Sequence, residues 1–155
     1  MNSILITGLK GGIGRTTVAE ALRYVCEQEN IEAEILDGHA RLNCDLRQKV
    51  KTADYALIVV EDGVFGQLDI AFMAKELLKD QTRCGVVINK ARDMEDVGLQ
   101  ELLLELNIPL LGSIAFNPYY AYVLSEEKNL AQEDKTVYDC LKNALAVMLS
   151  IEPEQ

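Results

Sequence analysis

The sequence predicts an α/β protein of three layers, in which helices cover both faces of a mostly parallel sheet of about five or more strands. The first observation behind this fold class is that short apolar runs, rich in β-branched residues, alternate along the chain with stretches of helical period. Such alternation is typical of βαβ units, whose right-handed crossovers place helices on both faces of a parallel sheet. The second observation is a glycine-rich turn between the first apolar run and the first helical stretch.

The apolar runs are the predicted strands, and they lie near residues 3–6, 33–36, 56–60, 85–88 and 109–114. Ligands of parallel sheets bind beyond the carboxyl ends of the strands, so the residues that follow these runs are expected to form the site. Four features fall at that edge: the glycine turn at residues 8–17, Asp37, Asn89 and the turn at residues 116–122.

Stretches of helical period predict the helices, near residues 18–26, 65–78, 96–106, 119–125 and 135–151. In the helix at 65–78, Leu68, Phe72 and Leu78 share one face, which makes that helix amphipathic.

Two of the predicted helices carry a set of residues typical of core packing. One set has the spacing i, i+3, i+4, i+7 and consists of Leu99, Leu102, Leu103 and Leu106. The other belongs to the last helix and consists of Val137, Leu141, Ala144, Leu145 and Met148. Near residues 119–125 three tyrosines occupy three of four consecutive positions, so at least one ring should be exposed.

Length and composition predict one domain over residues 1–155 with a substantial core, because 49% of the residues are hydrophobic. The net charge of −10 argues against a nonspecific nucleic-acid partner or an anionic membrane surface, since phosphates would be repelled. The first apolar run is too short for a signal peptide, and no run approaches the ~18 residues of a membrane span. A cytoplasmic protein is expected.

The four cysteines form no C-x-x-C pair, which speaks against a zinc or iron–sulfur site. Cys26, Cys84 and Cys140 are predicted to be small core residues, whereas Cys44 lies in a predicted loop. His39 is the only histidine and has no nucleophile motif near it, which sets aside Ser-His-Asp and Cys-His chemistry.

The glycine-rich turn at residues 8–17 follows a strand and opens a helix. Glycines let several backbone N–H groups converge on one point, and the positive end of the helix dipole adds to the field there. The turn therefore predicts an anion site, and a phosphate is the expected guest.

Lys10-Gly-Gly-Ile-Gly-Arg-Thr-Thr17 resembles the deviant Walker A loop of the MinD/ParA group of P-loop ATPases, Lys-Gly-Gly-x-Gly-Lys-Thr-Thr/Ser. The difference is Arg15, which stands where the pattern has the lysine that reaches the phosphates. The resemblance implies a P-loop NTPase-like fold, a Mg²⁺ contact by the Thr16 hydroxyl, and a Lys10 that reaches the partner's phosphates across a homodimer. It also implies that the loop binds the nucleotide through Gly11, Gly12, Ile13, Gly14, Arg15, Thr16 and Thr17.

The resemblance continues beyond the loop. Asp37 resembles the first carboxylate of the family's Asp-x-Asp motif, with His39 replacing the second; in an alternative alignment Asp37 ends the Walker B strand and holds Mg²⁺ through water. Both readings remain open. Asn89 ends a strand like the family's Val-Val-Asn-Lys/Arg, which implies an adenine contact, and residues 107–118 resemble the family's Ile-Pro strand and turn.

One family segment has no counterpart between Asp37 and the strand near residue 56. Either the strand with the γ-phosphate sensor Asp-x-x-x-Gly is absent, or Asp37 belongs to it and the preceding strand is absent. Both versions shorten the fold by one βα unit of ~30 residues. Because positions used in hydrolysis are lost and Arg15 replaces lysine, we expect nucleotide binding without efficient turnover.

A second resemblance, to short-chain dehydrogenases that bind NAD(P), rests on Thr7-Gly8 with Gly12-Ile-Gly14. Tyr138 and Lys142 fit that family's Tyr-x-x-x-Lys, and Ser125 precedes them by 13 residues. The MinD/ParA resemblance is favoured because its motifs cover nearly the whole chain.

The predicted function is an adenine-nucleotide-binding protein that takes ATP or ADP with Mg²⁺ and is a weak ATPase. By the resemblance, Lys10 and Asp37 are the implied catalytic residues, and Thr16 and Asp37 the metal contacts. Such a protein would act on a protein partner through nucleotide-dependent dimerisation. A noncatalytic, degenerate P-loop interaction module and a dehydrogenase-like oxidoreductase are the alternatives.

Overall fold

The structure, a computed structural model, describes residues 2–9, 12, 14–38, 48–49, 51–78, 83–93 and 95–150. Its centre is a parallel sheet in the order β2-β1-β3-β4-β5. The strands are β1 (Asn2–Thr7), β2 (Ala33–Asp37), β3 (Tyr55–Val60), β4 (Cys84–Ala91) and β5 (Leu110–Ala115). Each contains or overlaps a predicted run, so the five predicted strands and the α/β class are confirmed.

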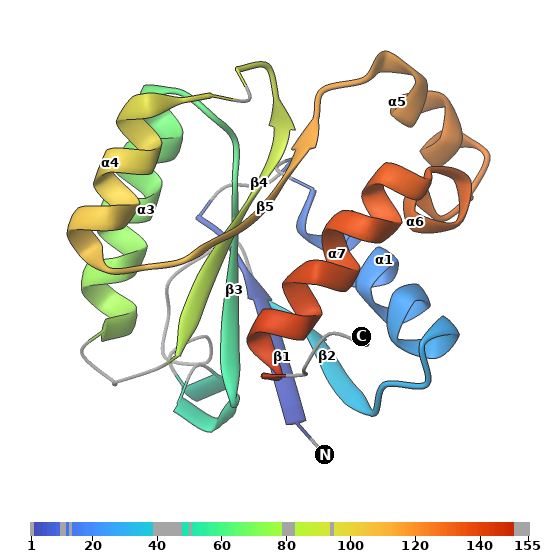
Figure 1. The fold of residues 1–155 in the computed structure, drawn as a ribbon, viewed down its shortest axis with the longest axis horizontal. Coiled ribbons are helices and arrows are strands. Elements are labelled where there is room, and N and C mark those ends of the chain that lie inside the picture. The colour runs from blue at the N-terminus through green and yellow to red at the C-terminus, as the bar shows by residue number, and fades with distance from the viewer. Residues whose placement is uncertain are drawn as a thin grey trace.

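Helices cover both faces of this sheet, as Figure 1 shows. Two lie on one face, α3 (Val64–Leu78) and α4 (Val97–Leu106), and α1 (Arg15–Gln28) and α7 (Lys135–Met148) lie on the other. Two short helices, α5 (Pro118–Ser125) and α6 (Leu130–Glu133), connect β5 to α7. The three predicted layers are therefore present. Among the helices in the described ranges, none combines the length and apolar character needed to cross a bilayer.

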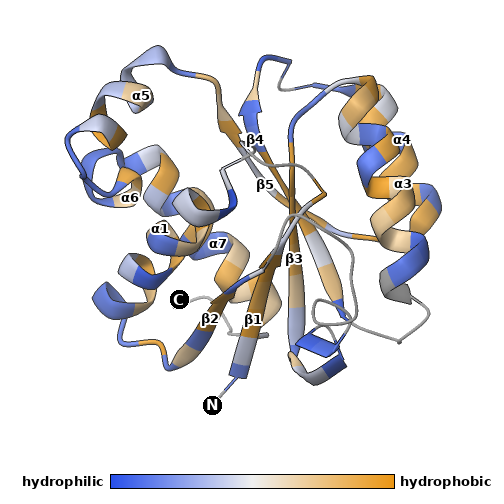
Figure 2. Cartoon of the chain, turned by 180° about the vertical axis from the view of Figure 1, so that it is seen from behind, coloured by the Kyte–Doolittle hydropathy of each residue, from blue (hydrophilic) through white to orange (hydrophobic). Residues whose placement is uncertain are grey.

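Strand β3 shows why the central strands are continuous apolar runs. All six of its residues are buried, and successive side chains point to opposite faces. Leu57 and Val59 belong to the core beneath α1 and α7, whereas Ile58 and Val60 belong to the core beneath α3 and α4. In Figure 2 the hydrophobic colour accordingly runs along the central strands β1 and β3.

Helix α3 packs with a different face from the one its sequence suggested. Leu68 is 60% exposed and Phe72 is 48% exposed, whereas Ile70 and Met73 are fully buried. The side chain of Leu78 lies outside the described part. The prediction was wrong because this helix is apolar on more than one side, and helical period alone does not say which stripe meets the sheet.

The core sets of the other two long helices are confirmed. In α4, Leu99 and Leu103 are buried and Leu102 and Leu106 pack against the same cluster. In α7 the whole predicted set is buried: Val137, Leu141, Ala144, Leu145 and Met148. The helix ends at Met148, while residues 151–155 lie outside the described part. Sequence patterning did not predict α6, which is a single helical turn.

The strand order fixes where a ligand can bind. The chain passes from β1 outward to β2 and then crosses to β3 on the other side of β1. Between β1 and β3 the crossover connections diverge to opposite faces, which leaves a crevice at the carboxyl ends of these strands. The glycine turn that leaves β1 lies at this point.

Candidate functional site

The described glycines of the turn have left-handed backbone conformations that favour glycine. Gly12 has φ of 80° and Gly14 has φ of 93°, and Gly14 is the residue that caps α1. Helices α4, α5, α6 and α7 each have a side chain that caps their first N–H groups. No side chain of the described residues caps α1, and uncapped N–H groups at a helix start can donate to an outside acceptor.

A small hollow lies over this helix start. Its volume is about 210 Å³, and it is lined by Gly12, Gly14, Arg15, Thr16 and Thr17. Backbone N–H groups and the helix dipole make the electrostatic field there favourable for an anion. The hollow lies at described residues of the predicted phosphate cradle, and phosphate binding there stays a prediction.

Asp37, at the end of the neighbouring strand, contacts Thr16, one of the residues that line this hollow. Because β2 pairs with β1, its end lies beside the turn, and the Thr16 hydroxyl donates to Asp37 Oδ2 at 2.7 Å. The other carboxylate oxygen, Oδ1, is buried and has no hydrogen-bond partner among the described residues. A buried carboxylate oxygen without a partner is costly, and a cation or water would satisfy it.

The Thr16–Asp37 pair offers the oxygen ligands that Mg²⁺ prefers. Within the described ranges there is no cluster of three or more His, Cys, Asp or Glu residues that could hold a metal alone. Mg²⁺ commonly keeps several waters and takes further ligands from substrate phosphates, so one carboxylate and one hydroxyl are sufficient protein ligands. The residues present therefore fit a Mg²⁺ ion that is shared with a bound phosphate.

Arg15 is tied to the same strand end as Asp37. Its Nη1 donates to the carbonyl oxygen of Gly38 at 2.5 Å, and the N–H of Gly38 donates to Ile6 O in β1. The guanidinium is thereby anchored on the β2 side of the loop.

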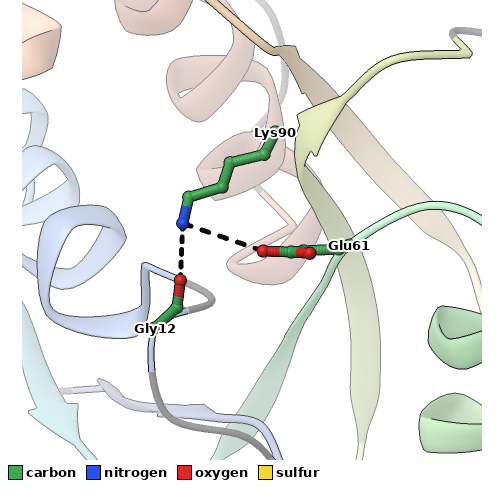
Figure 3. A network of polar contacts seen from close by, with 3 residues as sticks. All are labelled: Gly12, Glu61 and Lys90. Carbon is green, nitrogen blue, oxygen red and sulfur yellow. Dashed lines mark hydrogen bonds and ion pairs between the residues drawn. The ribbon is translucent and has the colours of Figure 1, made fainter. Parts of the chain in front are cut away.

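Asn89 and Lys90 approach the loop from the end of β4. Asn89 is only 6% exposed, and a Cβ added at Gly14 would overlap its Nδ2 atom. Lys90 Nζ donates to the carbonyl oxygen of Gly12 at 2.5 Å and lies 3.7 Å from Glu61 Oε1 (Figure 3). Sequence reasoning gave no role to Lys90 or Glu61, although both follow buried strand residues at the ligand edge, which is the signal that could have found them.

A larger pocket of about 530 Å³ adjoins the hollow. This volume is within the range of small-molecule sites. The polar end of the pocket is formed by Gly12, Gly14, Thr17, Asn89 and Lys90, and its walls are mostly apolar: Ala115, Phe116, Asn117, Pro118, Tyr120, Ala121, Leu124 and Leu130. The turn at residues 116–122, predicted to lie at the ligand edge, forms a large part of this wall.

No protein-family model matches the chain, and no curated protein matches it. Among solved structures, MinD of Aquifex aeolicus aligns with a TM-score of 0.78 at 14% identity, over 99% of either chain. An ATP complex of a Cyanothece McdA variant aligns with a TM-score of 0.77 at 12% identity, over 100% of this chain and 98% of the other.

A plasmid partition protein of Borrelia burgdorferi bound to AMPPNP aligns with a TM-score of 0.70 at 12% identity, over 96% of this chain and 98% of the other. The chain has the MinD/ParA fold. At these identities the likeness concerns the fold alone, so the deviant Walker A assignment and the loss of a βα unit stay predictions.

Two contacts hold the pocket wall of this MinD/ParA fold in place. The Tyr120 hydroxyl donates to Asp134 Oδ2 at 2.6 Å, and burial together with this carboxylate raises the pKa of Tyr120 to about 12. The Arg92 guanidinium lies over the Phe116 ring, 4.6 Å from its centroid. The neighbouring Tyr122 is 56% exposed, which confirms that at least one tyrosine of this turn faces solvent.

Tyr138 and Lys142, the Tyr-x-x-x-Lys pair of the dehydrogenase pattern, do not lie at the glycine turn. Tyr138 donates to Glu29 at 2.6 Å, and Lys142 lies 3.3 Å from the same carboxylate. Glu29 caps the carboxyl end of α1, a helix of 14 residues that spans about 20 Å from the glycine turn to that end. Through these contacts with Glu29, Tyr138 and Lys142 join the end of α1 to α7.

Several predicted residues lie outside the described part of the chain: Lys10, Gly11, Ile13, His39 and Cys44. The role of Lys10 across a dimer and the role of His39 therefore stay predictions. Of the other cysteines, Cys26 and Cys84 are buried and Cys140 is partly buried, in agreement with core packing.

Proposed function

We propose that this protein binds an adenine nucleotide with Mg²⁺ at the carboxyl edge of its sheet. The observation that carries the proposal is that the phosphate hollow and the apolar pocket share Gly12, Gly14 and Thr17. An anion cradle that continues into a mostly apolar pocket suits a ligand with a phosphate tail and a flat, weakly polar head. A nucleotide has this chemistry.

The choice of adenine is supported by two structures of the same fold, which were solved with ATP and with AMPPNP. Asn89, at the junction of the pocket and the turn, remains our proposed base contact. Tyr120 and Phe116 offer ring surfaces in the same pocket, and aromatic surfaces favour stacking with a planar base.

The proposed metal site consists of Thr16 and Asp37. Bound Mg²⁺ would neutralise charge on the phosphates. The adjacency of β2 to β1 and the contact of Asp37 with Thr16 support the Walker B reading of Asp37, because in P-loop NTPases a loop Ser/Thr and a Walker B Asp hold the ion together.

We propose slow turnover or none. The anchoring of Arg15 on Gly38 favours the noncatalytic module as the second candidate, because this guanidinium is already engaged on the β2 side of the loop. In the weak-ATPase version, Lys10 and Asp37 are the catalytic residues, and the protein works as a homodimer on a protein partner. A nucleic-acid partner is not part of this proposal, given the net charge of −10.

The test is calorimetric titration with ADP and with AMPPNP, each with and without Mg²⁺, and with NADH alongside. We expect binding by the parent protein and a loss of at least about tenfold in the Mg²⁺-dependent affinity of Thr16→Ala and Asp37→Asn, equivalent to about 1.4 kcal/mol. Thr136→Ala is the matched control, because Thr136 is also the second residue of an α-helix.

Each alternative gives a different outcome. Absence of binding by both nucleotides would contradict the proposal, whereas binding of NADH alone would favour the dehydrogenase resemblance. Phosphate release that requires Mg²⁺ and disappears in Thr16→Ala would select the ATPase over the noncatalytic module.

A further inference from the structure

We infer that Lys90 supplies the phosphate-binding cation of this site, in place of the loop position occupied by Arg15. The inference rests on the proposed nucleotide function and adds a residue to it. It follows from where the charged groups of Arg15, Lys90 and Glu61 lie around the turn.

Arg15 is the first residue of α1, and its guanidinium is directed toward the end of β2. The 2.5 Å hydrogen bond to Gly38 O anchors it there, and Gly38 itself is fixed to β1 by its own N–H. A planar guanidinium that keeps this bond has fewer orientations left than the compact ammonium of a lysine. We assign Arg15 to joining α1 to β2.

Lys90 comes to the turn from the opposite side. Two residues of β4, Asn89 and Lys90, face one residue of β5, because Ile88 pairs with Ser113 and Ala91 pairs with Ala115. Such a bulge re-aims the side chains of a strand. Lys90 also has φ of 55°, a left-handed conformation that costs a non-glycine residue about 1 kcal/mol or more. Strained backbone of this kind concentrates at functional sites.

The position of the ammonium suits a phosphate ligand. Lys90 Nζ donates to the carbonyl oxygen of Gly12. Lys90 lines the polar end of the larger pocket, where that pocket shares Gly12, Gly14 and Thr17 with the phosphate hollow. A lysine ammonium has three donors, and the Gly12 carbonyl accepts one of them. A nucleotide phosphate at the turn would therefore meet a cation that is already held at the loop.

Glu61 forms a weak ion pair with Lys90. The two groups are 3.7 Å apart, and each side chain is about half exposed, at 46% and 48%. An exposed ion pair of this kind contributes little free energy, so a multiply charged phosphate can compete with Glu61 for the ammonium. Without ligand, the Glu61 carboxylate thus keeps the Lys90 ammonium near the loop. When a phosphate binds, the ammonium can exchange the carboxylate for the phosphate.

The experiment measures the affinity of adenosine, ADP and ATP, with Mg²⁺ for the nucleotides, in the full chain and its variants. We expect Lys90→Gln to weaken ADP and ATP binding by about 10- to 100-fold, because one charge-assisted hydrogen bond to the phosphates is lost. Adenosine has no phosphate, so its binding should be unchanged. Lys142→Gln is the matched control, because Lys142 is also exposed and paired with a glutamate, at 3.3 Å, but lies on α7. Lys142→Gln should bind all three ligands as the parent does.

Two further variants separate the roles of the neighbouring charges. Arg15→Gln should lower the melting temperature, because it removes the contact between α1 and the end of β2. It should reduce the affinity for ADP less than Lys90→Gln does. Glu61→Gln should strengthen ADP binding several-fold, since it removes a competing negative charge next to the ammonium. The Glu61 variant keeps Lys90 and therefore tests the inference even if Lys90→Gln does not fold.

The outcomes distinguish this inference from the proposed function. If the parent protein binds none of the ligands, the proposed function fails. If the parent binds ADP but Lys90→Gln matches Lys142→Gln, the inference alone is overturned. It is also overturned if Lys90→Gln lowers the affinity for adenosine as much as the affinity for ADP. The same holds if Arg15→Gln lowers the ADP affinity more than Lys90→Gln does, or if Glu61→Gln does not raise the ADP affinity.

Discussion

Replacement of Gly14 by alanine is expected to destabilise the protein more than the same replacement at Gly12. Both glycines have left-handed φ, 93° and 80°, so an added Cβ strains the backbone at either position. Their surroundings differ. A Cβ at Gly14 would overlap Asn89 Nδ2 and lie 3.5 Å from its Cγ, whereas a Cβ at Gly12 has nothing of the described structure within 4 Å.

The magnitude follows from these two contributions. The left-handed conformation costs an L-residue about 1–2 kcal/mol, which applies to both variants. At Gly14 the Asn89 side chain must also move, and it is 6% exposed, so it has no free path to solvent. Overpacking of a closed site adds about 1–3 kcal/mol. Gly14→Ala should therefore cost roughly 2–5 kcal/mol in the free energy of unfolding, and Gly12→Ala about 1–2 kcal/mol.

The assay is thermal unfolding followed by circular dichroism without nucleotide, so that changes in binding do not alter the melting temperature. For a chain of this length each kcal/mol corresponds to about 2–4 °C, so the overpacking contribution should separate the two variants by roughly 2–12 °C. In an Asn89→Ala background the clash is absent, and Gly14→Ala should then cost about as much as Gly12→Ala. Equal melting temperatures for the two single variants would refute the reasoning.

The remaining predictions concern the pocket wall and helix α3. Tyr120→Phe should lower the free energy of unfolding by about 1–2 kcal/mol at neutral pH, because Asp134 Oδ2 loses the Tyr120 hydroxyl as its donor, while Tyr122→Phe should change it little. Burial and Asp134 raise the pKa of Tyr120 from 10.0 to about 12. The stability that the neutral Tyr120 hydroxyl contributes is therefore complete below pH 10 and is lost as the pH rises toward 12. Denaturation measured at a series of pH values over this range checks this loss. In α3, Ile70→Ala should cost about 2–5 kcal/mol and Leu68→Ala less than about 0.5 kcal/mol in urea unfolding, and a larger loss at Leu68 would contradict the packing described here.

The sheet could be predicted from the sequence because its strands are buried on both faces. A strand such as β3, with every residue buried, has to be a continuous apolar run, and such a run is visible without any tertiary information. Helix α7 was equally clear, because its predicted apolar set is wholly buried. In α4 the leucine spacing identified the core face, although Leu104 is apolar and exposed on another side. Helix α3 was not clear, because Leu68 and Ile70 are both apolar and only contact with the sheet distinguishes them.

The part of the candidate site near the glycine turn could also be predicted. Gly12, Gly14, Thr16 and Thr17 follow one another in the chain, and the carboxyl-edge rule brings Asp37 to them. The contact between Thr16 and Asp37 agrees with this expectation. The sequence also placed Arg15 among the phosphate-binding residues, which stays a prediction. Only the structure shows that its guanidinium donates to Gly38 O beyond the end of β2.

The sequence by itself determined the strands, the glycine turn at the head of the first helix, and the residues that end each strand. These are local properties, fixed by side-chain volume, polarity and backbone freedom within a few residues. The tertiary structure alone decided which charges surround the turn, since Lys90 and Gly12 are 78 positions apart and Tyr120 meets Asp134 across a helical connection. Contacts of this kind depend on strand order, on a bulge in β4 and on side-chain direction, none of which leaves a periodic signal in the chain.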